Sequence, residues 1–144
     1  MSRWENGRYA TPVKLGPELN GTNITNVEAF VSPDERFLFI GAFGRPDSLG
    51  SSDVYVSQRD GNRWLTPVNL GPLVNTPARE YSPRLTPDGK RLIFSSERGM
   101  TTEVRTSAWT MGEFERKSRS VLNGLGNLYS VPLSDLPAVA AGGR

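Results

Sequence analysis

The chain of 144 residues contains neither cysteine nor histidine. Without cysteine it forms no disulfide and offers no thiol nucleophile, and without both residue types it lacks the usual ligands of zinc. Catalytic triads that use imidazole are excluded for the same reason. The loop at Asp47–Asp53 carries oxygen ligands but not the alternating acidic spacing of a calcium loop. The sequence therefore predicts neither a metal site nor a cofactor.

Two further features are scarce: an excess of charge of one sign, and long hydrophobic runs. Seventeen basic residues are interspersed with fifteen acidic ones, giving a net charge of +2, so the sequence predicts no nucleic-acid partner. No apolar run approaches the roughly 20 residues that cross a bilayer, which predicts no membrane span. Residues 1–12, "MSRWENGRYATP", lack the apolar segment of a signal peptide.

The sequence repeats itself, and 15 glycines and 11 prolines punctuate the copies. "RYATPVKLGPELN" (8–20) matches "RWLTPVNLGPLVN" (63–75) at an offset of 55 residues. "SPDERFLFI" (32–40) matches "TPDGKRLIF" (86–94) at an offset of 54. "SDVYVS" (52–57) matches "GNLYSV" (126–131) at an offset of 74, so the second copy carries an insertion of about 20 residues.

Each copy reads as short antiparallel strands joined by tight turns, which predicts an all-β fold. Pro33-Asp34-Glu35 and Pro87-Asp88-Gly89 have turn residues between two apolar runs, and Asp60-Gly61 is a hairpin turn. Four short strands repeated every 50-odd residues are typical of a β-propeller blade. A β-sandwich or an open β-solenoid are the alternatives, and the sandwich ranks lower because it seldom repeats its sequence.

These motifs resemble the WD40-like propeller repeat of the TolB type, also called PD40. The resemblance rests on Thr86–Lys90 with Phe94–Ser96, on Ser52–Ser57 ("SDVYVS"), and on Trp64–Gly71 ("WLTPVNLG"). It covers nearly the whole chain except roughly 99–125 and the tail. It implies a periplasmic or extracellular setting. The departures from the pattern are Glu35, Phe37 and Ser130.

The resemblance implies one partial propeller domain over residues 1–144. Propellers have four to eight blades, and two cannot enclose an axis. Either further blades are missing from this chain, or several chains associate head to tail, each lending its first strand to the next, or the chain is an open module of two blades. The predicted parts are a lone outer strand at 8–20, a complete blade at 26–75, a second blade at 80–133 with an insertion at 99–125, and a tail at 134–144.

Charged residues near the starts of the first strands, and on one connecting loop, are the candidate binding residues for the rim or the central channel. No nucleophile with a base is evident, so we expect a non-catalytic binding or scaffolding module for a protein or small-molecule partner. The alternative is a glycan hydrolase that uses carboxylates such as Glu28 and Glu80. The candidates are Glu28, Arg45, Asp47, Arg79, Glu80 and Arg84.

The insertion breaks the strand rhythm. Met111, Phe114, Ser118 and Val121/Leu122 have helical spacing, with Ser107 or Thr110 as the N-cap. We expect a short helix that packs on the rim of the blade; a recognition element is the alternative.

Overall fold

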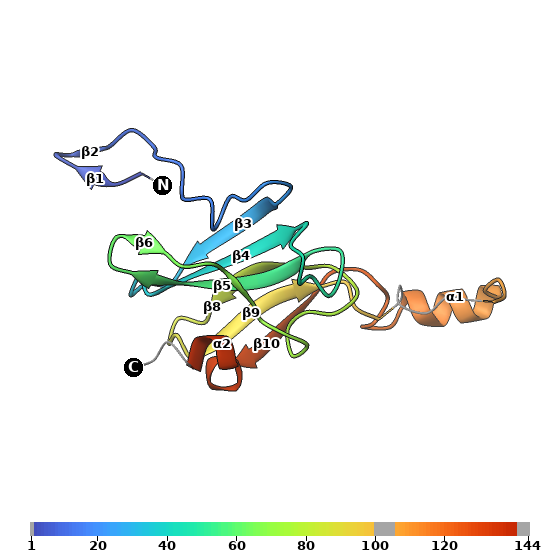
Figure 1. Cartoon of the computed structure of the whole chain (residues 1–144). Helices are drawn as coiled ribbons and strands as arrows, with labels where there is room; N and C mark the ends of the chain where they lie inside the picture. Colours follow the sequence, from blue (N-terminus) through green and yellow to red (C-terminus); the bar gives the residue numbers. More distant parts are fainter. Residues whose placement is uncertain (1, 100–105, 141–144) are drawn as a thin grey trace.

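The computed structural model of the chain describes residues 2–99 and 106–140, and it is built mainly from antiparallel strands (Figure 1). The all-β prediction is thus confirmed. No helix among these residues is long and apolar enough to cross a membrane. The elements are β1 (Trp4–Glu5), β2 (Arg8–Tyr9), β3 (Thr25–Val31), β4 (Phe37–Phe43), β5 (Asp53–Asp60), β6 (Arg63–Trp64), β7 (Val68–Asn69), β8 (Glu80–Leu85), β9 (Arg91–Ser96), α1 (Met111–Ser118), β10 (Asn127–Pro132), η1 (Leu133–Asp135) and α2 (Pro137–Ala140).

The first sheet has the order β3-β4-β5, and β6 and β7 both pair with the free side of β5. Strand β4 is buried over almost its whole length because both faces of the sheet are covered, which explains its unbroken apolar sequence. Pro67 lies in the gap between β6 and β7, on the outermost strand, where a missing N–H costs no ladder bond.

The second sheet has the order β8-β9-β10 and ends at β10 as an edge strand. Its register repeats that of the first sheet, since Phe94 lies opposite Tyr129 as Ile40 lies opposite Tyr55. The innermost strand of each sheet is interrupted by a register shift at the same place in the copy, near Val27 in β3 and between Tyr81 and Arg84 in β8.

The turns that open the two sheets form the same hydrogen bonds. The Ser32 hydroxyl donates to Asp34 Oδ1 at 2.5 Å, and the Thr86 hydroxyl donates to Asp88 Oδ1 at 2.6 Å. These bonds are the largest cause that lowers the pKa of each carboxyl group below its usual value. The prediction that both aspartates form turns is confirmed.

The two sheets stack face to face, and the main core lies between them. Residues from β4 and β5 meet residues from β9, and the helical tail closes the side of this core with Leu136 and Val139. The opposite face of the first sheet is covered by Leu15 and Leu19 from the N-terminal segment. Buried members of the main core are Phe37, Phe39, Val54, Val56, Leu70, Val74, Leu92 and Phe94.

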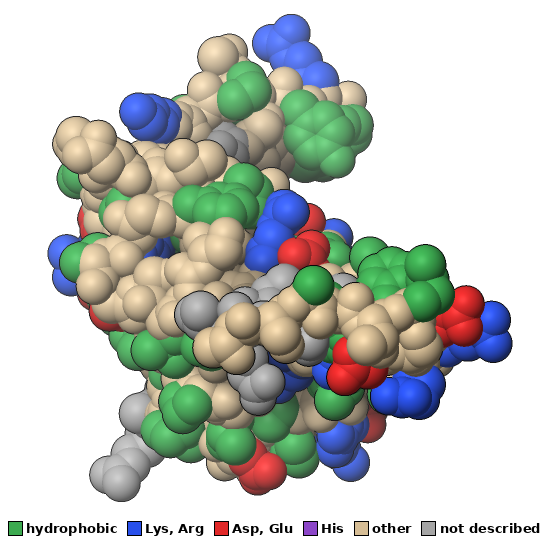
Figure 2. Space-filling view, turned by 90° about the vertical axis from the view of Figure 1, so that its right-hand side faces the viewer, with side chains coloured by type: hydrophobic (Ala, Val, Ile, Leu, Met, Phe, Trp, Pro, Cys, Tyr) green, Lys and Arg blue, Asp and Glu red, His purple; other side chains and the backbone are tan. Residues whose placement is uncertain are grey.

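The N-terminal segment differs from the predicted outer strand at 8–20. Only Arg8–Tyr9 is a strand, and it pairs with β1 in a small hairpin that stands off from the two sheets (Figure 1). In Figure 2 this hairpin overhangs a notch at the top of the molecule, and basic and acidic side chains are interspersed over the face below it. Residues 10–24 run over the first sheet without strand structure.

The insertion forms a short helix as predicted, but the helix ends at Ser118, before Val121 and Leu122, and is not packed on a sheet. Thr110 is the N-cap, in a reciprocal capping box with Glu113. None of the helix residues is buried, and Met111 and Phe114 are exposed. Figure 1 shows α1 projecting away from both sheets. The prediction of a helix is confirmed, whereas its expected packing is wrong. The residues of the insertion at 100–105 lie outside the described part.

Candidate functional site

Strand β8 lies against β3 and β4, and the line where they meet carries a row of arginines stacked on aromatic rings. The Arg79 guanidinium lies 5.6 Å from the ring centre of Phe43 and 5.0 Å from that of Tyr81. The Arg84 guanidinium lies 5.4 Å from the ring centre of Phe30. We call this line the seam; it comprises Glu28, Phe30, Phe43, Arg79, Tyr81, Ser82 and Arg84.

Both seam arginines are exposed. Among residues 2–99 and 106–140, neither Arg79 nor Arg84 is in an ion pair. The aromatic rings hold the guanidinium groups by cation–π contact, while the charged N–H groups stay accessible to water. The seam therefore presents two positioned cations that lack a carboxylate partner within the described part of the chain.

A hydrogen-bonded link between the two sheets fixes the centre of the seam. The Glu28 carboxylate accepts hydrogen bonds from the Ser82 amide and, at 3.1 Å, from the Ser82 hydroxyl. Ser82 has φ of 52°, the left-handed region that non-glycine residues rarely adopt. The link to Glu28 stabilises this conformation and so sets the path of β8 between its two arginines.

Arg45, predicted to lie on the rim, is instead buried with 7% exposure. It donates to the Leu19 carbonyl at 3.1 Å and to Asn26 Oδ1 at 3.3 Å, and it stacks over the Tyr55 ring at 5.0 Å. Burial lowers the pKa of its guanidinium. Neighbouring Asp47 is exposed, and its backbone carbonyl accepts from an asparagine side chain. Arg45 thus stabilises the fold and does not face solvent.

Glu80 is also internal, with 0% exposure. Its carboxylate accepts from the Thr76 amide at 2.9 Å and from the hydroxyls of Thr76 and Ser96, both at 2.6 Å. Arg98 lies 3.8 Å away. A glycan hydrolase would need two carboxylates that reach one cleft, and the Glu80 carboxylate does not reach solvent.

Arg98 repeats the role of Arg45 in the second sheet. It donates to the Val74 carbonyl at 2.6 Å and stacks over the Tyr129 ring at 4.5 Å, while Val74 and Tyr129 are the repeat partners of Leu19 and Tyr55. Each arginine therefore ties the end of one copy of "LGP…N" to the third strand of the sheet that follows. The sequence signal was an arginine shortly after β4 and β9, in "FGRP" and "SERG".

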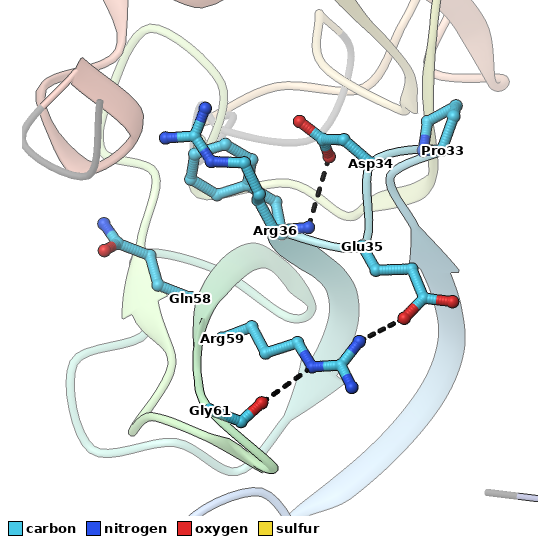
Figure 3. A pocket seen from close by; sticks show the side chains of 8 residues that line it. Pro33, Asp34, Glu35, Arg36, Gln58, Arg59 and Gly61 are labelled. Carbon is cyan, nitrogen blue, oxygen red and sulfur yellow. Dashed lines mark hydrogen bonds and ion pairs between the residues drawn. The ribbon is translucent and has the colours of Figure 1, made fainter. Parts of the chain in front are cut away.

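A concave surface lies at the turns of the first sheet, and sequence reasoning did not find it (Figure 3). It is an open depression of about 470 Å³, lined by the Pro33–Phe37 turn and by Gln58, Arg59 and Gly61. Arg59 reaches across it to form an ion pair with Glu35, and its Nε donates to the Gly61 carbonyl at 3.0 Å. This depression is thus internally neutralised, unlike the seam.

No cluster of three or more metal-ligating side chains occurs among the described residues.

No protein-family model, curated protein or solved structure matches this chain.

Proposed function

We propose that this chain is a non-catalytic binding module made of two β-propeller-type blades similar to those of TolB, and that the seam takes the partner. The blade assignment is supported by two sheets, stacked face to face, whose first three strands have the same order, β3-β4-β5 and β8-β9-β10. It is further supported by identical turn bonding and by the recurring arginine ties of Arg45 and Arg98. The periplasmic or extracellular setting is part of the same proposal.

The observation that carries the binding role is the pair of exposed arginines, Arg79 and Arg84, each stacked on a seam ring. Arginine and tyrosine are enriched at the energetically dominant positions of protein interfaces. A stacked guanidinium loses little conformational entropy on binding and donates paired hydrogen bonds to a carboxylate. The matching partner is an acidic segment of a protein, or a small molecule with carboxylate groups.

A peptide-display selection tests the proposal directly. A random peptide library is selected on the wild-type chain and on the double variant Arg79→Ala/Arg84→Ala. We expect peptides rich in Asp and Glu to be enriched on the wild type and to bind the double variant at least tenfold more weakly. The matched control is Arg116→Ala/Arg119→Ala, at the C-terminal end of α1, which removes the same charge from another exposed site.

Peptides that bind wild type and the seam double variant equally would refute the assignment of the seam. If the α1 control variant binds the peptides as weakly as the seam double variant does, the binding is general attraction between charges and does not occur at the seam. Circular dichroism and urea unfolding of each variant establish that the fold is retained.

A further inference from the structure

The two sheets differ at their outer edge. In the first sheet, β6 and β7 pair with the outer edge of β5, and Val54, which lies in the core between the two sheets, has 0% exposure. In the second sheet β10 is the edge, and Leu128, the repeat partner of Val54, has 77% exposure. Edge strands offer unpaired backbone groups to another strand. The second sheet thus lacks the outer strand that its counterpart has.

The segment whose sequence matches this missing strand is present elsewhere in the chain. Residues 8–20 repeat residues 63–75, which supply β6 and β7 to the first sheet. Tyr9 in this segment is 72% exposed, whereas its partner Trp64 is 7% exposed. Residues 63–75 are therefore paired with the third strand of a sheet, whereas residues 8–20 are not.

The segment cannot reach the β10 of its own molecule. Leu15 and Leu19 anchor it on the face of the first sheet that points away from the second sheet. The first sheet consequently stands between residues 8–14 and β10, as Figure 1 shows for the hairpin and β10. Pairing with β10 within one molecule would require this anchor to unfold.

We infer that residues 8–15 of a second copy of this chain add to β10 as an antiparallel strand. The pairing of β7 with β5 supplies the register: Asn69 lies opposite Tyr55 and Val68 lies opposite Val56. The repeat offsets replace Asn69 and Val68 by Lys14 and Val13, and Tyr55 and Val56 by Tyr129 and Ser130. Lys14 of one copy is then opposite Tyr129 of the other, and Val13 is opposite Ser130.

The backbone bonds transfer in the same way. Leu70 donates its amide to the Val54 carbonyl at 3.2 Å, and the Asn75 side chain pairs with both backbone groups of Val54 at 2.8 Å. Leu15 and Asn20 of the incoming copy are the equivalent residues, and both meet Leu128. Each molecule then has one donor end and one acceptor edge, so copies join head to tail.

The outer face of the second sheet sets the strength of this association. Two of its residues are more polar than their partners in the first sheet, since Ser130 replaces Val56 and Arg91 replaces Phe37, and a third is smaller, since Ile93 replaces Phe39. Less apolar area is then buried between copies than between the two sheets of one molecule. The association is accordingly reversible and depends on protein concentration. It does not involve the seam, so its test is independent of the proposed function.

Because the chain has no cysteine, engineered disulfides test the register cleanly. A Val13→Cys variant is mixed with a Ser130→Cys variant under mild oxidation. Directly opposite residues in an antiparallel pair have Cα atoms about 4.5 or 5.5 Å apart, within the range of about 4.4–6.8 Å that a disulfide spans. The control mixture is Val13→Cys with Ser118→Cys, whose serine is exposed on α1.

We expect the mixture of Val13→Cys with Ser130→Cys to give a crosslinked dimer at least tenfold faster than the control mixture. Sedimentation of the wild-type chain over a wide concentration range measures the association without any substitution, and we expect its mean mass to rise with concentration. Equal rates in the two mixtures would mean random collision and would overturn the inference. A wild-type chain that stays monomeric at every concentration would also overturn the inference. That result is expected if the missing strand belongs to a longer protein and not to a second copy of this chain.

Discussion

Replacing Glu80 by alanine is the sharpest test of how the segment before the second sheet is held on that sheet. The carboxylate accepts three hydrogen bonds, from the Thr76 amide and from the hydroxyls of Thr76 and Ser96, at 2.6–2.9 Å. Its side chain has no exposure, so water does not replace the lost acceptor. The substitution leaves these donors and the nearby Arg98 guanidinium without their common partner.

The size of the effect follows from these contacts. A hydrogen bond to a charged group contributes about 1.5–3 kcal/mol. The hydroxyls can rotate toward other acceptors, and Arg98 keeps its bond to the Val74 carbonyl, so the three contributions do not add fully. Removing one partner from a buried charged network costs about 3–5 kcal/mol. We expect Glu80→Ala to lower the free energy of unfolding by about 4 kcal/mol.

Equilibrium urea unfolding, followed by tryptophan fluorescence, measures this change. Trp64 is buried in the first sheet and reports on its integrity. With a slope of about 2 kcal/mol per molar urea, the midpoint falls by about 2 M. Glu80→Gln keeps the shape but places an amide donor against Thr76, so its loss should be smaller. Glu115→Ala, on the exposed face of α1, is the control and should change stability by less than about 0.5 kcal/mol.

A loss below about 1 kcal/mol in Glu80→Ala would refute the reasoning, because a buried carboxylate with three donors cannot be that dispensable.

Three further predictions concern the turns and the interior. Glu35 has φ of 55°, so Glu35→Gly removes left-handed strain of about 1–2 kcal/mol. The same substitution loses an exposed ion pair with Arg59 that contributes about 0–1 kcal/mol. A higher urea midpoint is expected, and a lower one would show that the ion pair contributes more than the strain costs. The Ser32 hydroxyl lowers the pKa of Asp34 below 3.8, so the turn is stabilised above that pH and the stabilisation is lost as the pH falls through the native pKa. Urea midpoints measured across that acid range should therefore depend less on pH in Asp34→Asn, and an unchanged dependence would contradict this. Burial raises the pKa of Tyr55 to about 12. The contribution of the neutral phenol to stability is therefore intact below the usual value of 10.0 and is lost as the pH rises toward 12. Tyr55→Phe should unfold at higher pH than wild type, as followed by circular dichroism.

The arginine ties explain why the repeat is strict at some positions and loose at others. Arg45 and Arg98 each need a carbonyl from the preceding "LGP…N" segment and a tyrosine from the third strand. Because both partners come from distant parts of the chain, a tie forms only when a sheet packs on the segment before it. Position 35 is looser, since Glu35 takes the place of Gly89 at the cost of backbone strain.

Local chemistry in the sequence was enough to determine the strands of the two sheets and the two matching turns, and it limited the cap of α1 to Ser107 or Thr110. A Pro-Asp pair flanked by hydroxyl residues closes its own hydrogen bonds within a few residues, so it forms the same turn wherever the copy occurs. The capping box at Thr110 is equally local. The sequence also identified the charged positions Arg79 and Arg84, which the structure places at the seam.

The tertiary structure alone decided which charges are buried and which are free. Arg45 and Glu80 have the same local pattern as exposed rim residues, yet a ring, carbonyl groups and hydroxyls from other elements enclose them. The orientation of α1 and the open edge of β10 were likewise decided by what lies beside them in space. A charged side chain is buried only where distant segments supply its partners, and that proximity is a property of packing, which no short stretch of sequence contains.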